Sequence, residues 1–337
     1  MTEQTYGSAG VNLDAAQDVK RLIGAIVSPT HGPQVLGGIG GFGAMYRLAG
    51  YEDPVLVSST DGVGTKLKIA IWMDRYDTIG EDLVNACVND IVVSGAKPLF
   101  FLDYLAVGVL DARVVESLIS GMARACKQAD CALIGGETAQ MPGVYADKDF
   151  DMAGFVVGAV ESRNILDGSK IAKGDILIGI PSNGLHTNGY SLVRHVLELD
   201  RDQAPLEEYV PELAQTLGEA LLTPHMPYYR TVRDALPMLK GLAHITGGGL
   251  VENVPRVLPD GTGARFDTSR WEVPPIFTVL QERSNISREE MYRVFNMGLG
   301  MVLVCDRADA DRVLASVPES RVVGEVTETT GDRRVAL

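Results

Sequence analysis

Basic residues, cysteines and unbroken apolar runs are scarce in this sequence, and each shortage excludes a class of protein. Lys and Arg total 30 against 44 Asp and Glu, so the 337 residues carry a formal charge of -14. A chain this acidic repels nucleic acid phosphates and anionic membrane surfaces unless a local basic patch intervenes. The sequence has no such patch, and we therefore expect neither a nucleic-acid nor a membrane partner.

A long stretch without charged residues, 22–46, is too irregular to span a membrane. It contains seven glycines together with Pro29 and Pro33, and a helix interrupted in this way leaves backbone groups unpaired in lipid. The opening residues, MTEQTYGSAG, lack the basic and apolar regions of a signal peptide. We expect the chain to remain in the cytoplasm.

Cysteine usage agrees with a reducing compartment. The four cysteines form no CxxC pair and lie among apolar neighbours, which predicts reduced, buried thiols and excludes disulfides or zinc ligation. They are Cys87, Cys126, Cys131 and Cys305.

The length and the alternation of strand and helix patterns predict two domains of α/β or α+β type. At ~150 residues per domain, a chain of this length forms roughly two. A polar stretch with Gly, Ser and Lys, residues 161–174, separates the two patterned halves. We place the boundary at Gly168, with domains at 1–168 and 169–337. Pattern alone leaves the strand order open.

Hydrophobic periodicity predicts the main elements of both halves. We expect helices at 14–27, 82–94, 111–128 and about 190–199, with Asp111 as an N-cap. The acidic segment 200–222 also reads as mostly helical and exposed. Strands are expected at 55–60, 99–107, 131–134, 152–160, 175–180 and 300–305.

Five glycines within residues 37–43 form the first candidate binding loop. Glycine allows close backbone approach, and successive N–H groups can surround a phosphate. A flexible surface loop is an equally good interpretation. The GxGxxG spacing of Gly38, Gly40 and Gly43 does not indicate a dinucleotide fold, because no strand precedes it and no crossover helix follows.

A second cluster, residues 61–66, follows directly on the strand pattern VLVSST. Asp61 offers a metal-binding carboxylate, Thr65 a hydroxyl and Lys66 a cation for nucleotide phosphates. The order of Thr65 and Lys66 differs from that of a P-loop. A hairpin turn at Asp61 and Gly62 is the alternative.

Two further acids stand in apolar surroundings and need a partner if they are buried. Asp90 lies in CVNDIVVSGA and Glu137 in CALIGGETA, and an unpaired buried carboxylate is costly. Magnesium prefers oxygen ligands and is often shared between carboxylates and phosphates. Asp61, Asp90 and Glu137 are therefore a candidate magnesium set if the fold brings them together. The alternatives are a polar helix face for Asp90 and a capping role for Glu137.

Two loops of the second half precede helices and so offer candidate anion sites. His186 lies in SNGLHTNG, and Thr246 begins a TGGG run in HITGGGLVENV. An imidazole near neutrality can move protons or bind phosphate. A solvent-exposed histidine and a simple helix entry are the alternatives.

Taken together, these motifs resemble the phosphoribosylformylglycinamidine cyclo-ligase, or aminoimidazole ribonucleotide synthetase, family. The resemblance covers nearly the whole chain and rests on several segments in order. These are GGIGGFGAMY, STDGVGTKL, CVNDIVVSGAKPLFFLDYLAVG, ALIGGETAQMPGVY, SNGLHTNGYSLVRH, HITGGGLVENVPRVLP and FNMGLGMV.

The resemblance implies an ATP-dependent ring closure in purine biosynthesis. Formylglycinamidine ribonucleotide would become aminoimidazole ribonucleotide, with release of ADP and phosphate through an iminophosphate. It also implies Mg²⁺ and a homodimer whose N-terminal mixed sheets pair into a barrel, each flanked by a C-terminal α/β sandwich domain.

The same resemblance assigns roles to residues of this sequence. The metal ligands would be Asp61, Asp90 and Glu137. The nucleotide phosphates would be held by Gly38, Gly40, Gly41, Gly43, Thr65 and Lys66. The catalytic groups would be Lys66, His186 and Asp103. The substrate would be held by Asn183, His186, Thr246, Gly247 and Gly248.

Three other functions compete with this one. The first is another ATP-using enzyme of the same superfamily, such as formylglycinamidine ribonucleotide synthetase, thiamine monophosphate kinase or selenophosphate synthetase. The last resembles a pattern with a cysteine in its N-terminal glycine-rich region, whereas the first cysteine here is Cys87. The second is a nucleotide-binding scaffold, which intact acids argue against. The third, a nicotinamide-dependent enzyme, lacks its structural context.

Overall fold

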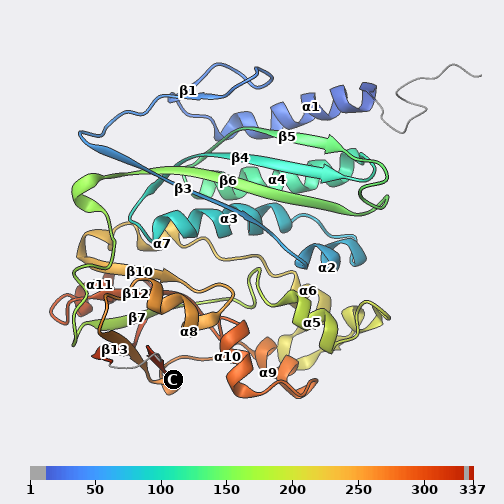
Figure 1. Cartoon of the computed structure of the whole chain (residues 1–337). Coiled ribbons are helices and arrows are strands. Elements are labelled where there is room, and N and C mark those ends of the chain that lie inside the picture. The colour runs from blue at the N-terminus through green and yellow to red at the C-terminus, as the bar shows by residue number, and fades with distance from the viewer. Residues whose placement is uncertain (1–12, 330–333) are drawn as a thin grey trace, which may run out of the picture.

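Two main β-sheets, one from each half of the chain, organise residues 13–329 and 334–337, which the computed structural model describes (Figure 1). The first sheet has the order β3-β6-β4-β5 and the second β10-β12-β7-β13-β11-β14. The strands are β1 (Val35–Leu36), β2 (Met45–Tyr46), β3 (Pro54–Gly62), β4 (Lys97–Val107), β5 (Ala132–Gln140), β6 (Phe150–Glu161), β7 (Ile176–Pro181), β8 (Tyr209–Val210), β9 (Gln215–Thr216), β10 (Leu239–His244), β11 (Thr262–Phe266), β12 (Leu299–Cys305), β13 (Arg321–Glu328) and β14 (Val335–Ala336).

Helices cover these sheets and lie between them in Figure 1. They are α1 (Leu13–Val27), α2 (Lys66–Trp72), α3 (Ile79–Val92), α4 (Ala112–Gln128), α5 (Tyr190–Val196), α6 (Leu217–Leu221), α7 (Tyr229–Val232), α8 (Gly249–Asn253), α9 (Pro275–Glu282), α10 (Arg288–Val294) and α11 (Ala310–Ser316). None of those in the described ranges has the length and apolar character needed to cross a membrane.

The first sheet is mixed because one of its connections is a helical crossover. β4 and β5 are parallel and α4 joins them, whereas β6 is antiparallel to both β4 and β3. A parallel pair requires such a crossover. The mixed two-domain α/β fold expected from the sequence is confirmed.

Most predicted elements are present within a few residues of their expected bounds. Asp111 caps α4 as predicted, since its carboxylate accepts from the N–H of Arg113 at 2.9 Å. β5 extends beyond the predicted residue 134, because its pairing with β4 continues through Gly135 and Gly136 to Gln140. All four cysteines are free and buried, which confirms the prediction of reduced core thiols.

The prediction for residues 200–222 was wrong. Only α6 is α-helical in this segment, which otherwise holds short 3-10 turns and the two-residue strands β8 and β9. Two prolines, Pro205 and Pro211, and the short apolar stretches prevent a continuous helix, because proline lacks the N–H that the helix interior requires. α6 forms where Thr216 and Glu219 make a capping box.

α3 lies between the first sheet and the C-terminal domain and is buried on nearly every side (Figure 1). Asp82, Asn85 and Asn89 are spaced so that they share one face of the helix. This face binds the backbone of residues 225–228: Asp82 accepts from the N–H of His225 at 2.8 Å, and Asn89 accepts from that of Tyr228 at 3.0 Å. Backbone hydrogen bonds therefore join the two domains.

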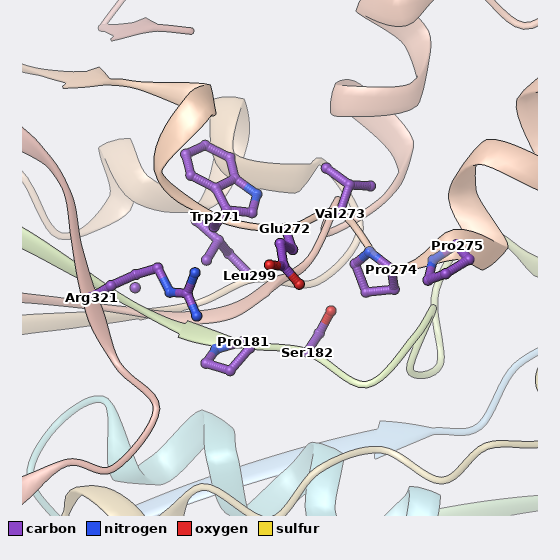
Figure 2. A pocket seen from close by; sticks show the side chains of 10 residues that line it. Pro181, Ser182, Trp271, Glu272, Val273, Pro274, Pro275, Leu299 and Arg321 are labelled. Carbon is purple, nitrogen blue, oxygen red and sulfur yellow. The ribbon is translucent and has the colours of Figure 1, made fainter.

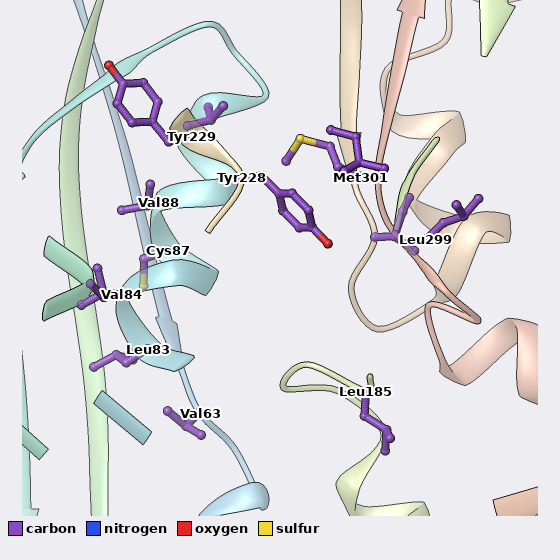
Figure 3. Packing of buried hydrophobic residues seen from close by; sticks show 14 of the residues in the cluster. Val63, Leu83, Val84, Cys87, Val88, Leu185, Tyr228, Tyr229, Leu299 and Met301 are labelled. Atoms are coloured by element: carbon purple, nitrogen blue, oxygen red, sulfur yellow. The ribbon is translucent and has the colours of Figure 1, made fainter. Parts of the chain in front are cut away.

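Apolar packing strengthens the same boundary. Figure 3 shows Tyr228 between the α3 side chains Val88 and Cys87 on one side and Leu299 and Met301 on the other. The Tyr228 ring is fully buried, and its hydroxyl donates to the carbonyl of Pro181 at 2.8 Å. The domains thus share one continuous core.

Candidate functional site

Two carboxylates meet where β3 ends beside α3. Asp61 is at the end of β3, and Asp90 is in the last turns of α3. Burial raises the pKa of Asp61, the N–H of Gly62 lowers it, and the charge of Asp90 raises it. Ser59, on the same strand face as Asp61, donates to Asp90 Oδ2 at 3.2 Å. Two neighbouring anions with oxygen atoms still able to accept are a suitable pair for a hard cation.

The C-terminal domain contributes a histidine to this pair. His244 ends β10, and its Nδ1 lies 2.8 Å from Asp90 Oδ1. The His244 side chain is buried, whereas about a third of Asp90 stays exposed, at 36%. The acid pair therefore lies at the boundary between the two domains.

The structure does not bring Glu137 to the other two acids. β5 lies three strands from β3, and Glu137 is in register with Tyr104, which faces away from α3. The opposite face carries Phe101 and Leu105, both fully buried. Among the described residues, no three His, Cys, Asp or Glu side chains are close enough to hold one metal ion. A single chain thus supplies two of the three predicted ligands at one place.

The glycine-rich loop also lies away from the acid pair. It connects β1 and β2 in an antiparallel hairpin, and its glycines are exposed. Beside it, a Cβ placed on Gly135 would be 3.8 Å from that of Ala44, on the sheet face shared with Leu102. No helix follows the loop before β3, so the dinucleotide interpretation stays excluded. The predicted glycines here are Gly38, Gly40, Gly41 and Gly43.

Lys66 is not available to a phosphate. It is completely buried at the start of α2, with Nζ 2.9 Å from Asp82 Oδ1, 2.7 Å from the carbonyl of Thr223 and 3.2 Å from that of His186. An ammonium has three donors, and all of them are engaged. Burial lowers the pKa of Lys66 and raises that of Asp82 to about 6, while the pairing opposes both shifts. The role predicted for Lys66 at the nucleotide does not fit this geometry.

The other predicted residues of the domain boundary lie near its rim. Thr65 is exposed, and its hydroxyl is 3.0 Å from that of Ser191 in α5. Asn183 is also exposed and donates to the carbonyl of Pro224 at 3.0 Å. Gly247 is exposed, and a Cβ there would lie 3.1 Å from Asn188 Oδ1. The SNGLHTNG and HITGGG loops therefore lie side by side, as a shared substrate site requires.

Thr246 and Gly248 complete the second of these loops. Asn253 in α8 fixes its shape by donating to the carbonyls of Gly247 and Gly249 at 3.1 and 2.9 Å, and the Thr246 hydroxyl donates to Asn253 Oδ1 at 3.3 Å. Gly248 has a φ of +95°, which only glycine adopts readily.

His186 is not the exposed loop histidine that the sequence allowed. Only 1% of it is accessible, and neither ring nitrogen has a hydrogen-bond partner. Its ring stacks on that of His225 with centroids 4.1 Å apart. Burial lowers the pKa of His186 well below its usual value, with further lowering by His244 and Lys66. The His186 ring is therefore enclosed by the protein, whereas Asn183 in the same loop is exposed.

Asp103 is likewise separate from the domain boundary. It lies on β4 between the inward-facing Phe101 and Leu105, and its carboxylate covers Gly136, where a Cβ would be only 2.2 Å away. The pKa of Asp103 is raised to about 7, mainly by burial. A hydrogen bond from its own backbone N–H lowers this pKa, and the charge of Glu137 raises it further. Asp103 and His186, both predicted as catalytic groups, thus lie in different parts of the structure, one in the first sheet and the other at the domain boundary.

A cavity of about 210 Å³ opens in the C-terminal domain beside β7 and β12. Figure 2 shows Trp271, Glu272, Pro274 and Arg321 around it. None of the residues predicted for the site lines this cavity. The acid pair thus lies at an open domain boundary and not in this pocket.

Sequence reasoning missed His225 and gave His244 no role of its own. Both lie in segments whose local pattern is unremarkable, LLTPHMPYY and LAHITGGG. His244 had one available signal, since it ends a buried strand directly before a glycine-rich loop. His225 had none, because its partners come from α3 and β10.

Comparison with known proteins covers both domains. Residues 42–160 match the family model described as AIR synthase related protein, N-terminal domain, and residues 172–336 match its C-terminal domain. The phosphoribosylformylglycinamidine cyclo-ligase of Carboxydothermus hydrogenoformans is 51% identical over 345 residues, covering 100% of this chain and 99% of that protein. The enzyme of the same name from Trichlorobacter lovleyi is 52% identical, covering 96% and 94%.

Solved structures of lower identity share the fold. A hydrogenase maturation protein HypE in complex with ATP is 15% identical with a TM-score of 0.65, covering 94% of this chain and 89% of that one.

Proposed function

Because this chain belongs to the AIR synthase family, we propose that Asp61 and Asp90 bind the magnesium ion of MgATP at the boundary between its two domains. The enzyme is an ATP-dependent cyclo-ligase of purine biosynthesis, which closes the ring of formylglycinamidine ribonucleotide to give aminoimidazole ribonucleotide. The observation that carries the proposal is the pair of neighbouring carboxylates, whose mutual repulsion contributes to the raised pKa of Asp61. The cytoplasm is the proposed location, as for an enzyme that draws on free ATP.

The donor set suits magnesium. Mg²⁺ is commonly held by one or two carboxylates, with water and substrate phosphates completing its shell. When bound, it neutralises charge on the phosphoryl group that ATP transfers. Ser59 and His244 each donate to one oxygen of Asp90 and so orient that carboxylate. Both oxygens keep a further lone pair for a cation.

The adjoining loops of the C-terminal domain are the proposed substrate site. Residues 246–248 and Asn183 are polar or glycine positions at the rim of the same boundary. The oxygen of an amide is a poor leaving group, and its phosphorylation to an iminophosphate lets an amidine nitrogen of the same substrate attack. Orientation then supplies much of the catalysis, because nucleophile and electrophile belong to one molecule. Thr65, exposed at the rim of the same boundary, is the hydroxyl proposed for the phosphates.

Lys66 and His186 take structural roles in this proposal. The Lys66 ammonium joins α2 and α3 to two carbonyls of the C-terminal domain. Removing one partner of a buried ion pair leaves an uncompensated charge, which is strongly destabilising. The stacked His186 ring supports the His225 ring beside it.

A homodimer is proposed from the uncovered face of the first sheet. Leu56, Tyr104 and Phe155 are 61%, 41% and 40% exposed. The register places all three on the face away from α3, since Thr60 and Leu102 both pair with Phe155. Two such faces packed together as a barrel would bury the apolar side chains and remove the open strand edges.

The glycine-rich loop and Glu137 also lie on this uncovered side. Asp61 and Asp90 lie on the opposite, α3 side of the sheet. We therefore propose that a nucleotide that contacts both sets of residues takes them from two subunits.

The proposed domains remain 1–168 and 169–337. The first main sheet ends at Glu161, the second begins at Ile176, and Gly168 has a φ of +76° between them.

The test is ADP release with formylglycinamidine ribonucleotide, measured against Mg²⁺ concentration for Asp61→Asn and Asp90→Asn. Each change keeps size but removes a charge, and we expect turnover to fall by ~100-fold or more, with a higher Mg²⁺ requirement. Asp234→Asn, at a side chain 76% exposed, is the matched control and should behave as the unaltered enzyme. Unchanged activity and Mg²⁺ dependence in both variants would remove the acid pair from the mechanism.

A further inference from the structure

A chain of hydrogen bonds leads from Asp90 through two histidines to the SNGLHTNG loop. Asp90 Oδ1 is 2.8 Å from His244 Nδ1. His244 Nε2 is 3.0 Å from His225 Nε2. His225 Nδ1 is then 3.3 Å from the hydroxyl oxygen of Thr187. The two rings and the hydroxyl come from three separate segments.

The hydrogen bond between Asp90 and His244 determines which atom donates and which accepts in the other two hydrogen bonds. An ionised carboxylate accepts only, so His244 must carry its hydrogen on Nδ1. In a neutral ring, His244 Nε2 is then an acceptor, and His225 must donate from its own Nε2. His225 Nδ1 is left as an acceptor for the hydroxyl of Thr187. Each ring thus has one tautomer consistent with the whole chain.

Backbone hydrogen bonds and ring stacking restrain His225 in the position from which it contacts His244. Its backbone N–H donates to Asp82 Oδ1 at 2.8 Å, and its carbonyl accepts from Asn85 Nδ2 at 2.7 Å. Stacking on His186, with the ring planes 19° apart, restrains the imidazole itself. The ring is 1% exposed, so water does not compete for its nitrogens.

We infer that His225 is a positioning residue for the acid pair: it donates to His244 Nε2 and thereby acts together with Asp90 to select the tautomer and orientation in which His244 holds Asp90. The inference rests on the proposed function, since it concerns the same magnesium site. Outer partners of this kind orient metal-binding carboxylates and tune affinity. The His244 and His225 rings also connect Asp90 to Thr187, which lies in a loop of the proposed substrate site.

The direct test is the tautomer of His244, read from ring nitrogen signals of the ¹⁵N-histidine-labelled full chain without metal or nucleotide. The sequence has only five histidines, and His244→Gln identifies the signals by their loss. We expect hydrogen on Nδ1 of His244 and on Nε2 of His225. A hydrogen on Nε2 of His244 would overturn the inference.

Two amide variants separate positioning from packing. In His225→Gln the amide nitrogen reaches the place of Nε2 and still donates to His244, whereas in His225→Asn it reaches only the place of Nδ1. We expect His225→Gln to keep the His244 tautomer and His225→Asn to give a mixture, with half-saturating Mg²⁺ raised ~10-fold in ADP release. His195→Gln, at an exposed histidine of α5, is the control for labelling.

The outcomes distinguish this inference from the proposed function. Equal His244 spectra, or equal Mg²⁺ requirements, in His225→Asn and His225→Gln contradict the positioning role. If instead Asp61→Asn and Asp90→Asn leave the Mg²⁺ dependence unchanged, the proposed metal site fails, and the tautomer spectra still report independently on the His225 contact.

Discussion

At the scale of single residues, burial separates the groups that act on ligands from those that hold the fold. Both Lys66 and Asp90 were predicted to act at the nucleotide, as a phosphate-binding cation and as a metal ligand. Lys66 has its three donors satisfied inside the protein, whereas Asp90 keeps 36% of its side chain exposed. A side chain can bind a substrate or metal ion only if it is accessible and still has a donor or acceptor that the protein does not use. Asp90 therefore remains a ligand in our proposal, and Lys66 becomes a link between domains.

Asp103 provides a prediction about pH. Its pKa is raised to about 7, mainly by burial, against about 3.9 in an unfolded chain. Between these values the folded state holds a proton that the unfolded state has lost, so this residue's contribution to stability falls as pH rises through that window. At about 1.4 kcal/mol for each pKa unit, the loss amounts to a few kcal/mol.

The measurement is the free energy of urea unfolding at about pH 4.5 and at about pH 7.5. These two values enclose most of the range between the unfolded and folded pKa values of Asp103. Asp103→Asn cannot ionise and should lose less stability over the interval than the unaltered protein. Glu137→Gln removes a nearby charge that raises the pKa, so it should reduce the loss partially. Equal losses in the unaltered protein and Asp103→Asn would show that Asp103 does not titrate there.

At the scale of elements, two glycines allow close contact between α4 and α3, the helix that carries Asp90. The two helices meet through glycines. A Cβ on Gly80 would lie 2.0 Å from the carbonyl oxygen of Leu118, and one on Gly121 would lie 2.8 Å from that of Asp77. Backbone atoms cannot move aside as side-chain ends do. The separation of α3 from α4 is therefore determined by these two residues.

We predict that Gly80→Ala lowers the free energy of unfolding by ~3 kcal/mol, the upper end for overpacking, because the added methyl group meets backbone. Gly24→Ala in α1 is the matched control. It has no atom within 4 Å of a Cβ, so alanine's better helix propensity should raise stability by ~0.5–1 kcal/mol. Chemical denaturation of both variants measures this, and an equal effect of the two substitutions would contradict the close helix contact.

At the scale of the whole molecule, the uncovered face of the first sheet is the surface through which we propose association with a second copy. Exposed apolar side chains gathered on one face mark interaction surfaces in water-exposed proteins. The helices α3 and α4 cover the other face, whereas the β1–β2 hairpin covers this one only in part, at Gly135 and Phe100. The proposed nucleotide site needs that partner, because the glycine-rich loop and Glu137 lie on this side.

We predict that Leu56→Lys weakens the dimer. A buried charge at this face should cost about 2 kcal/mol or more, which raises the dimer dissociation constant by ~30-fold. Sedimentation velocity over a concentration series measures it. Tyr209→Lys, at a residue equally exposed at 61% but on β8, should leave the dimer intact. A monomer in the unaltered protein, or equal effects of the two substitutions, would exclude this face as the interface.

Local sequence patterns predicted much of the architecture, and several motifs that occur in the family's order along the chain predicted the family. Periodicity predicted α1, α3, α4 and the long strands because an apolar face must be buried whatever its partner. The same reasoning failed for residues 200–222, where local turns and capping decide the backbone. It also could not tell that Glu137 faces away from α3, since strand register depends on the neighbouring strand.

The sequence by itself predicted the long helices and strands of the N-terminal half, the two-domain division and the acids able to bind a cation. Only the tertiary structure decided which of those acids meet and what orients them. His244 lies 154 positions from Asp90 and reaches it at 2.8 Å, while Lys66 is enclosed by atoms from three distant segments. Burial and hydrogen bonding are properties of neighbours in space, and the order of residues along the chain does not specify those neighbours locally.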